Sequence, residues 1–155
     1  MTHNTSTEFT PHVTVATVVE KNGKFLFVEE ESSGQKVLNQ PAGHLEPNES
    51  LIEAAIRETL EETGWHVSIT GLLCIGLYTS PNNGVTYHRT TFIGQAEQHD
   101  QDAKLDDGII QALWLAPDEV AKYPSRPRSP LVMEAVHQYL DQSAYPLSIV
   151  GDSRA

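Results

Sequence analysis

The chain alternates short runs of β-branched and apolar residues with polar segments rich in glycine, asparagine and proline. Such runs predict strands, and the polar segments between them predict turns. Asn22-Gly23 separates the first two runs and predicts a tight hairpin. We expect residues 29–36 to form a polar loop and residues 41–43 to break the chain. The expected strands are residues 13–19, 25–28, 37–38, 65–78, 85–96 and 109–115.

Three other segments are expected to form helices. The first helix is expected at residues 50–63, where Asn48 or Ser50 can cap its first turn and Gly64 can end it in the left-handed conformation. Two further helices are expected at residues 117–119 and 129–139.

The order of these elements predicts an α/β (α+β) fold, in which a mixed sheet carries helices on its faces. At 155 residues the chain has the size of one domain. Residues 1–10 are expected to be a flexible lead-in, and residues 11–155 a single domain.

Composition narrows the function. Apolar residues make up 39% of the chain and charged residues 20%, as in globular proteins, and no apolar run is long enough for a membrane helix. The N-terminus lacks a secretory signal and the single Cys74 cannot form an internal disulfide, so a cytoplasmic protein is expected. The formal charge of −11 argues against binding to a nucleic-acid duplex. The same charge would repel a phosphorylated substrate unless cations bound first.

Acidic residues cluster on one arc of the helix expected at residues 50–63. At about 100° per residue, Glu58, Glu61 and Glu62 share an arc of about 100°. This pattern predicts a helix that buries its apolar side and presents three carboxylates on the other. The residues expected on the buried side are Ile52, Ile56, Thr59, Leu60 and Thr63.

This arrangement opposes the electrostatics of the helix. Like charges three and four residues apart each destabilise a helix by a few tenths of a kcal/mol, and acids near its end oppose the helix dipole. Only Arg57 offers local compensation. A solvated acidic face is one explanation, and a bound cation is the other. Oxygen ligands without paired His or Cys indicate Mg²⁺ or Mn²⁺ rather than Zn²⁺.

Residues 43–65 resemble the Nudix box in every spacing: Gly43, then Glu49, then Arg57-Glu58, then Glu61-Glu62, then Gly64. Thr59 and Trp65 depart from the pattern, because aliphatic residues are usual there. Neither position supplies a ligand, so the departures concern packing.

The resemblance to the Nudix hydrolase family implies a mixed sheet sandwiched between helices and a metal-dependent hydrolase of phosphoric anhydrides. It implies that Glu58, Glu61, Glu62 and the Gly43 carbonyl hold the metal, that Arg57 orients Glu58, and that Glu49 braces the loop. The general base varies within the family. The candidates here are Glu58, Glu97, Asp106 and Asp107.

Nearly the whole chain is similar to the phosphatase NudJ subfamily, including residues 39–46 and 128–132. That similarity implies release of orthophosphate from nucleoside tri- and diphosphates, and activity on hydroxymethylpyrimidine or thiamine diphosphate. The alternatives are another Nudix substrate, such as a damaged nucleotide, a nucleotide sugar or an RNA end, or a non-catalytic nucleotide-binding module. Either a monomer or a homodimer is compatible with the sequence.

Contacts to the substrate are expected from four side chains, Gln40, His44, Arg89 and Arg128. A loop hydrogen bond is an equal alternative for His44. Lys122 and Arg126 join Arg128 in the only basic cluster, which is either a solvated loop or a clamp. Tyr78 and Tyr87 are candidates for stacking on a heterocycle, whereas Trp114 is expected in the core.

Overall fold

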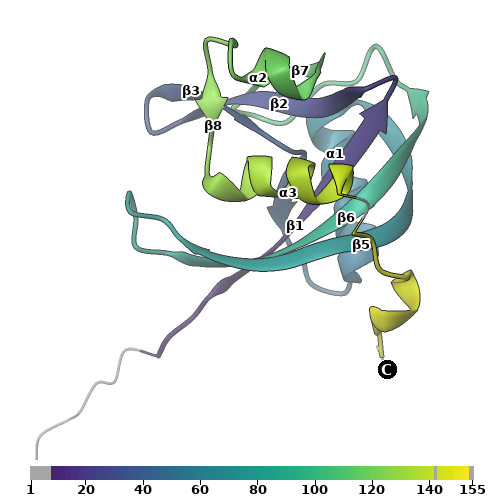
Figure 1. Cartoon of the computed structure of the whole chain (residues 1–155). Coiled ribbons are helices and arrows are strands. Elements are labelled where there is room, and N and C mark those ends of the chain that lie inside the picture. The colour runs from purple at the N-terminus through teal and green to yellow at the C-terminus, as the bar shows by residue number, and fades with distance from the viewer. Residues whose placement is uncertain (1–7, 142, 154–155) are drawn as a thin grey trace, which may run out of the picture.

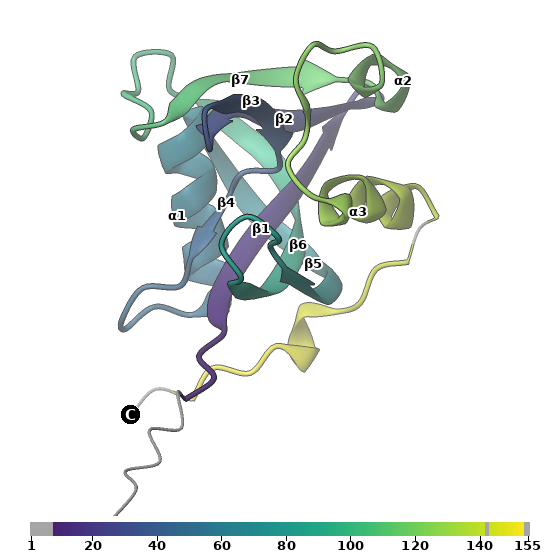
Figure 2. The same cartoon turned by 90° about the vertical axis from the view of Figure 1, so that its left-hand side faces the viewer.

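Eight strands form one mixed sheet in the computed structural model, which describes residues 8–141 and 143–153. The sheet is strongly curved, with α1 (Leu51–Thr63) on one side and α3 (Pro130–Leu140) on the other (Figures 1 and 2). A short helix, α2 (Pro117–Val120), precedes α3, and a 3-10 helix at Leu147–Ile149 follows it. The strands are β1 (His12–Lys21), β2 (Lys24–Ser32), β3 (Gln35–Asn39), β4 (Ala42–His44), β5 (Trp65–Thr79), β6 (Thr86–His99), β7 (Ile109–Leu115) and β8 (Arg126–Pro127).

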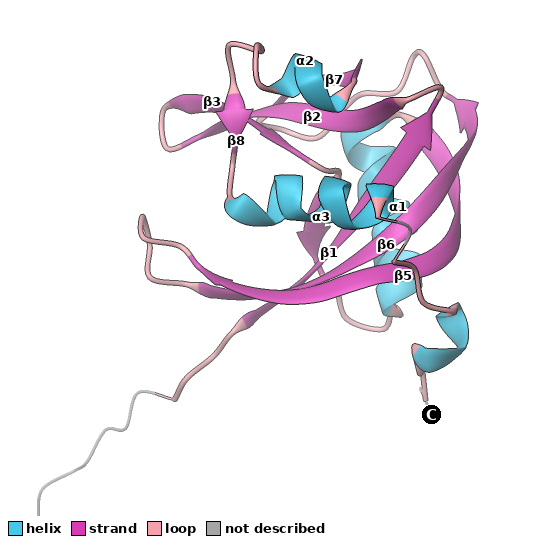
Figure 3. Cartoon of the chain, viewed as in Figure 1, coloured by secondary structure: helices cyan, strands magenta, loops and turns pink. Residues whose placement is uncertain are grey.

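Strand β1 joins the two halves of the sheet (Figure 3). Along most of its length it pairs in parallel with β6, and at its far end it turns back antiparallel into β2. The order of the sheet is β5-β6-β1-β2-β3-β8, with β4 paired to β1 and β7 paired to β2. Pairing of Val15 with Gly43 brings the start of the box against the central strand.

The two faces of β1 are buried against different helices. Val15 packs with Ala54 and Ala55 of α1, whereas Val18 packs with Val132 and Val136 of α3. Successive residues of a strand point to opposite faces, so a strand buried on both sides reads as one apolar run. The α/β fold class is confirmed. Within the described residues, no helix has both the length and the hydropathy to span a bilayer.

The first hairpin forms as expected, because Asn22 and Gly23 both have positive φ, at 54° and 77°. The loop expected at residues 29–36 was wrong. Strand β2 continues to Ser32, and Glu29 and Glu30 are buried at 6% and 8% exposure. Hydrogen bonds from distant residues satisfy these two carboxylates, and such partners cannot be read from a local run of acids. The break expected at residues 41–43 is only partly present: Gln40 and Pro41 separate β3 from β4, whereas Ala42 and Gly43 belong to β4.

Local signals fix both ends of α1. Ser50 accepts the backbone N–H of Glu53, and the Glu53 carboxylate accepts the N–H of Ser50, which forms a capping box. Gly64 ends the helix with φ 73°.

The expectation that the acidic side of α1 is exposed was wrong. Glu58 and Glu62 are each only 8% exposed, because β4 and the loop after β6 cover that side of the helix. The sheet covers the other side. A helical wheel shows which residues share a face of one helix, but it cannot show that another segment of the chain covers the polar face.

Of the two departures from the box pattern, Thr59 is buried and Trp65 is partly buried against the core. Thr59 donates its hydroxyl to the Ala55 carbonyl at 2.7 Å, and its Oγ1 lies 3.0 Å from Thr17 Oγ1, so a buried polar group is satisfied. Trp65 stacks on His99 and meets Trp114 edge to face, with ring centroids 4.7 and 5.6 Å apart. Trp65 and Trp114 are partly buried and pack against the buried cluster of Val19, Leu26 and Val67, so Trp114 packs against the core, as expected.

Candidate active site

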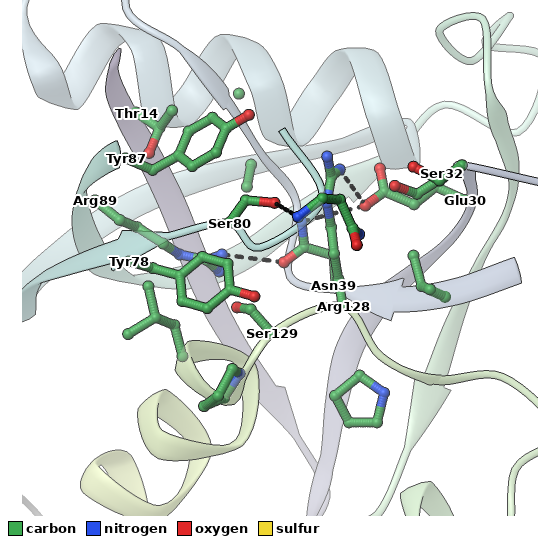
Figure 4. A pocket seen from close by; sticks show the side chains of 18 of the residues that line it. Thr14, Glu30, Ser32, Asn39, Tyr78, Ser80, Tyr87, Arg89, Arg128 and Ser129 are labelled. Carbon is green, nitrogen blue, oxygen red and sulfur yellow. Dashed lines mark hydrogen bonds and ion pairs between the residues drawn. The ribbon is translucent and has the colours of Figure 1, made fainter. Parts of the chain in front are cut away.

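A cavity of about 1100 Å³ lies between β4, the tip of the β5–β6 hairpin and the segment that leads into α3. Gly43 and Glu58 form part of its wall beside α1. Figure 4 shows another part of the wall, where polar and aromatic side chains from several strands point inward. These side chains include Thr14, Glu30, Asn39, Tyr78, Tyr87, Arg89 and Arg128.

Three carboxylates converge beside α1. One oxygen from each of Glu58, Glu61 and Asp106 lies within 4.8 Å of the others. The backbone N–H of Asp106 donates to the Glu61 carbonyl at 3.0 Å, which docks the loop after β6 onto the helix. Hard oxygen donors in close proximity, with little cationic compensation, fit Mg²⁺ or Mn²⁺. The structure thus brings Asp106 to the cluster, where the sequence had offered it only as a candidate base.

Arg57 organises this end of the cavity. Its guanidinium forms a bidentate pair with Glu49, at 2.6 and 2.9 Å. The same side chain donates to Glu58 Oε1 at 2.8 Å, to Glu61 Oε2 at 3.1 Å and to the His44 carbonyl at 3.0 Å. One planar group therefore ties the loop before α1 to two acids of the cluster.

The pKa values of Glu49 and Glu58 shift in opposite directions, although Arg57 contacts both carboxylates. Hydrogen bonds from Arg57 lower the pKa of Glu49. Burial raises the pKa of Glu58 even though Arg57 opposes the shift. Glu58 is therefore the more basic carboxylate of the two, a property that suits a group that must accept a proton.

Glu62 lies apart from the three clustered acids. Its carboxylate turns toward β4 and accepts the backbone N–H of Ala42 at 3.0 Å. Burial raises the pKa of Glu62 to about 9, so without a cation it is protonated at neutral pH. The sequence had grouped Glu62 with Glu58 and Glu61 because all three share one arc of the helix.

Gly43 has no room for a side chain. A Cβ at this position would lie 2.1 Å from the Glu58 carboxyl carbon. The backbone of β4 therefore approaches the carboxylate as closely as glycine permits.

Gly43→Ala is expected to displace the Glu58 carboxylate and to lower turnover by about 10²-fold or more, since small displacements of a catalytic group have effects of this size. Most of the fold should survive, because the clash involves the end of a side chain. Turnover and thermal unfolding measured on the same preparation test this expectation. Gly34→Ala is an unsuitable control because Gly34 has positive φ, whereas Gly151 has nothing within 4 Å of an added Cβ. Normal turnover by Gly43→Ala beside a normal Gly151→Ala would contradict the expectation.

The expected substrate contacts fall into two groups. Arg89, Arg128 and His44 line the cavity. The Nε2 atom of His44 also lies 3.0 Å from the Nδ1 atom of His12. Gln40 is 1% exposed and is absent from the cavity wall. Its amide accepts from Arg89 and donates to the backbone of α3, so it can affect a ligand only through Arg89.

The weaker candidates separate in the same way. Tyr78, Tyr87 and Arg126 line the cavity, whereas Lys122 and Trp114 do not. In the list of base candidates, Glu97 accepts a hydrogen bond from Ser68 on the exposed part of β6, and Asp107 lies outside the carboxylate cluster.

Sequence reasoning missed Glu30 and Asn39 as parts of the cavity wall. The Asn39 amide donates to Glu30 and accepts from Arg89, so it links two charged groups. Asn39 stands in the segment that resembles known relatives, and this was its only signal. Glu30 gave none, because it belonged to a run of acids that predicted a loop.

Comparison with known proteins agrees with this geometry. The NUDIX domain family matches residues 8–136. Phosphatase NudJ of Escherichia coli K12 is 40% identical over 144 residues, which cover 93% of both chains. A solved NUDIX hydrolase from Nitrosomonas europaea is 46% identical with a TM-score of 0.89, over 93% of this chain and 98% of that one.

A more distant structure shares only the fold. The NUDIX domain of Shewanella oneidensis NrtR, solved with ADP ribose, is 16% identical with a TM-score of 0.68, over 86% of this chain and 88% of that one. The match to the family and the identity to NudJ both extend across the box and the cavity. The chain therefore belongs to the Nudix family and is a hydrolase of acid anhydrides in phosphorus-containing compounds.

Proposed function

We propose that this protein is a Mg²⁺-dependent hydrolase that releases orthophosphate from nucleoside tri- and diphosphates, with hydroxymethylpyrimidine or thiamine diphosphate as further substrates. The observation that carries the proposal is the cavity itself, which has clustered carboxylates in one part of its wall and arginine and tyrosine side chains in another. Identity to phosphatase NudJ over 93% of the chain supports the choice of substrate class.

Glu58 and Glu61, with the Gly43 carbonyl, would hold the cation, and Asp106 lies close enough to join them. Glu62 lines the same cavity and would join after losing its proton, which a nearby cation favours. When bound, the cation neutralises phosphate oxygens and lowers the pKa of a water molecule.

The side chains of the protein perform the remaining steps. Arg57 holds the Glu58 carboxylate in one orientation, and Glu49 fixes Arg57 in turn. Glu58 would accept the proton of the attacking water, because Arg57 holds its carboxylate in place in the wall of the cavity. Asp106 is the alternative base, because it is the one later acid in the described residues that joins the cluster.

Tyr78 and Tyr87 support a flat, heterocyclic substrate. They pair across the strands at the tip of the β5–β6 hairpin and both line the cavity. Asn83 donates to the Tyr87 hydroxyl at 3.1 Å, and the Tyr87 ring meets His12 edge to face, so that ring is held in place. Tyr78 is the side chain left to stack on a base.

A time course of both phosphate products tests the proposal. The protein is incubated with a nucleoside triphosphate and Mg²⁺, and orthophosphate, pyrophosphate and the nucleotides are measured together. We expect orthophosphate, a transient diphosphate, and hydrolysis of diphosphates supplied alone. The box positions the cleavage chemistry, while the cavity decides which phosphorus lies beside it.

The Glu58→Gln variant, purified in the same way, controls for contaminating phosphatases. Stoichiometric pyrophosphate with inert diphosphates would overturn the proposed products and leave family membership intact. Absence of hydrolysis across nucleotides and heterocyclic diphosphates would overturn the substrate class.

A further inference from the structure

Arg89 is a buried cation without an acidic partner in direct contact. Its side chain lies in the cavity wall at 8% exposure. It donates to two neutral amide oxygens, Asn39 Oδ1 at 3.1 Å and Gln40 Oε1 at 2.6 Å. None of the ion pairs among residues 8–141 and 143–153 includes Arg89, and its buried Nε has no hydrogen-bond partner there.

Burial of a charge is costly unless the charge is paired, and a guanidinium has five N–H donors to satisfy. Burial lowers the pKa of Arg89 to about 10, so the side chain is still cationic at neutral pH. The amide oxygens of Asn39 and Gln40 orient this cation, and no carboxylate contacts it among the described residues. Such an arrangement indicates that an anion from the cavity completes it.

A second arginine lies in the same part of the wall. Arg128 donates to Glu30 Oε1 at 2.7 Å, and Asn39 donates to the same oxygen at 3.3 Å (Figure 4). Asn39 thus connects Arg89 to the pair formed by Glu30 and Arg128. This group contains two cations and one carboxylate, so it has an excess of positive charge. The Arg128 side chain is 45% exposed and can reach a ligand.

We propose that Arg89 and Arg128 form a subsite for a phosphate group, separate from the carboxylate cluster of Glu58, Glu61 and Asp106. Guanidinium groups bind phosphate oxygens through charged, paired hydrogen bonds, which fits this ligand better than a neutral one. The phosphate comes either from the part of the substrate that is not attacked or from released orthophosphate. The inference rests on the proposed function for the identity of the substrate, but the binding of phosphate can be measured without turnover.

Binding of inorganic phosphate is measured by ³¹P NMR titration in buffer that contains a chelator, so that no cation contributes. The variants are Arg89→Met and Arg128→Met. Lys36→Met is the matched control, because it removes one positive charge from an exposed position on β3 that is not part of the cavity wall. We expect Arg89→Met to weaken phosphate binding about tenfold or more, Arg128→Met about fivefold, and Lys36→Met less than twofold. Equal binding by all three variants overturns the subsite.

Loss of the Arg89 fork removes two buried hydrogen bonds, so thermal unfolding is recorded for each variant. If Arg89→Met does not fold, Arg128→Met decides the question, because its half-exposed side chain is not part of the core. Weakened phosphate binding by folded Arg128→Met supports the subsite, and unchanged binding overturns it.

A methylene-bridged nucleoside diphosphate and the matching monophosphate, both with Mg²⁺, identify the source of the phosphate. If the subsite takes a phosphate of the intact substrate, Arg128→Met weakens binding of the diphosphate analogue. If it takes only released orthophosphate, binding of the analogue is unchanged and only binding of orthophosphate falls. If the protein hydrolyses nucleotides but neither arginine variant changes phosphate binding, the subsite is refuted and the proposed function stands. If phosphate binding needs the arginines but the protein hydrolyses no nucleotide, the proposed function is refuted and the subsite stands.

Discussion

Hydrolysis is expected to fall by about 10³-fold or more when divalent cations are removed with a chelator, and to return when Mg²⁺ or Mn²⁺ is added. Glu58, Glu61 and Asp106 place their oxygens within 4.8 Å of one another, and Arg57 is the only cation that contacts them among the described residues. A cation that neutralises phosphate oxygens contributes several kcal/mol to the transition state, and about 1.4 kcal/mol corresponds to a tenfold change in rate.

The measurement is the initial rate of orthophosphate release during a titration of metal into chelated protein. Ca²⁺ provides a control for charge alone, since it binds oxygen ligands with a larger and looser coordination shell. Zn²⁺ is a second control, because the cluster lacks histidine and cysteine. Full activity in chelated buffer would rule out the proposed role of the cluster.

Glu58→Gln is expected to lower turnover by about 10²- to 10⁴-fold, which is the usual contribution of a general base. Glutamine retains the shape of the side chain and can still accept the Arg57 hydrogen bond, but it cannot take up a proton at neutral pH. Glu97→Gln is the matched control, because Glu97 lies on the exposed part of β6 with Ser68 as its partner. Normal turnover by Glu58→Gln, or an equal loss in Glu97→Gln, would contradict the assigned role of Glu58.

Glu62→Gln separates catalysis from folding in the same helix. Turnover is expected to fall, while the free energy of unfolding of the metal-free protein at pH 8 should rise. Each unit of pKa shift corresponds to about 1.4 kcal/mol, so the increase is on the order of a few kcal/mol. The amide of glutamine can still accept the Ala42 N–H, and the cost of taking up a proton on folding disappears.

The pH dependence of stability follows from the direction of the Glu62 shift. The pKa of Glu62 is raised from 4.5 to about 9 in the folded protein, so between these values the folded state binds more protons than the unfolded state. The free energy of unfolding should therefore decrease as the pH rises from about 5 toward 9. Urea denaturation in chelator at pH 5, 7 and 9 should show this slope in the wild type and a weaker slope in Glu62→Gln. Identical slopes would show that the Glu62 carboxylate is ionised in the folded protein.

Features that depend on neighbouring residues were predicted well from the sequence. The ends of α1 follow from the Ser50 and Glu53 capping box and from Gly64, because capping involves backbone groups within one turn. The first hairpin follows from Asn22-Gly23 for the same reason. The proximity of Glu61 to both Arg57 and Glu58 was also predictable, since residues three and four apart lie side by side on any helix.

Features that depend on which segments pack together could not be predicted in this way. Glu29 and Glu30 belonged to an acidic run that resembled a loop, and their burial depends on Ser125 and Arg128 near the other end of the chain. Gln40 was expected to contact substrate, but the tertiary structure places it behind Arg89. The type of a polar side chain determines which groups it can hydrogen-bond, but only the fold determines which of those groups lie beside it.

The sequence by itself determined the family and the helix that carries the acids, and it predicted the kind of cation that those acids can hold. Only the tertiary structure decided that Asp106 joins Glu58 and Glu61 while Glu62 turns away and is buried. It alone also decided that Arg89 faces the cavity without an acidic partner in contact. The physical reason is that the geometry of a helix is set by local backbone bonds, whereas burial, and with it the pKa of a carboxylate or a guanidinium, is set by segments distant in the sequence.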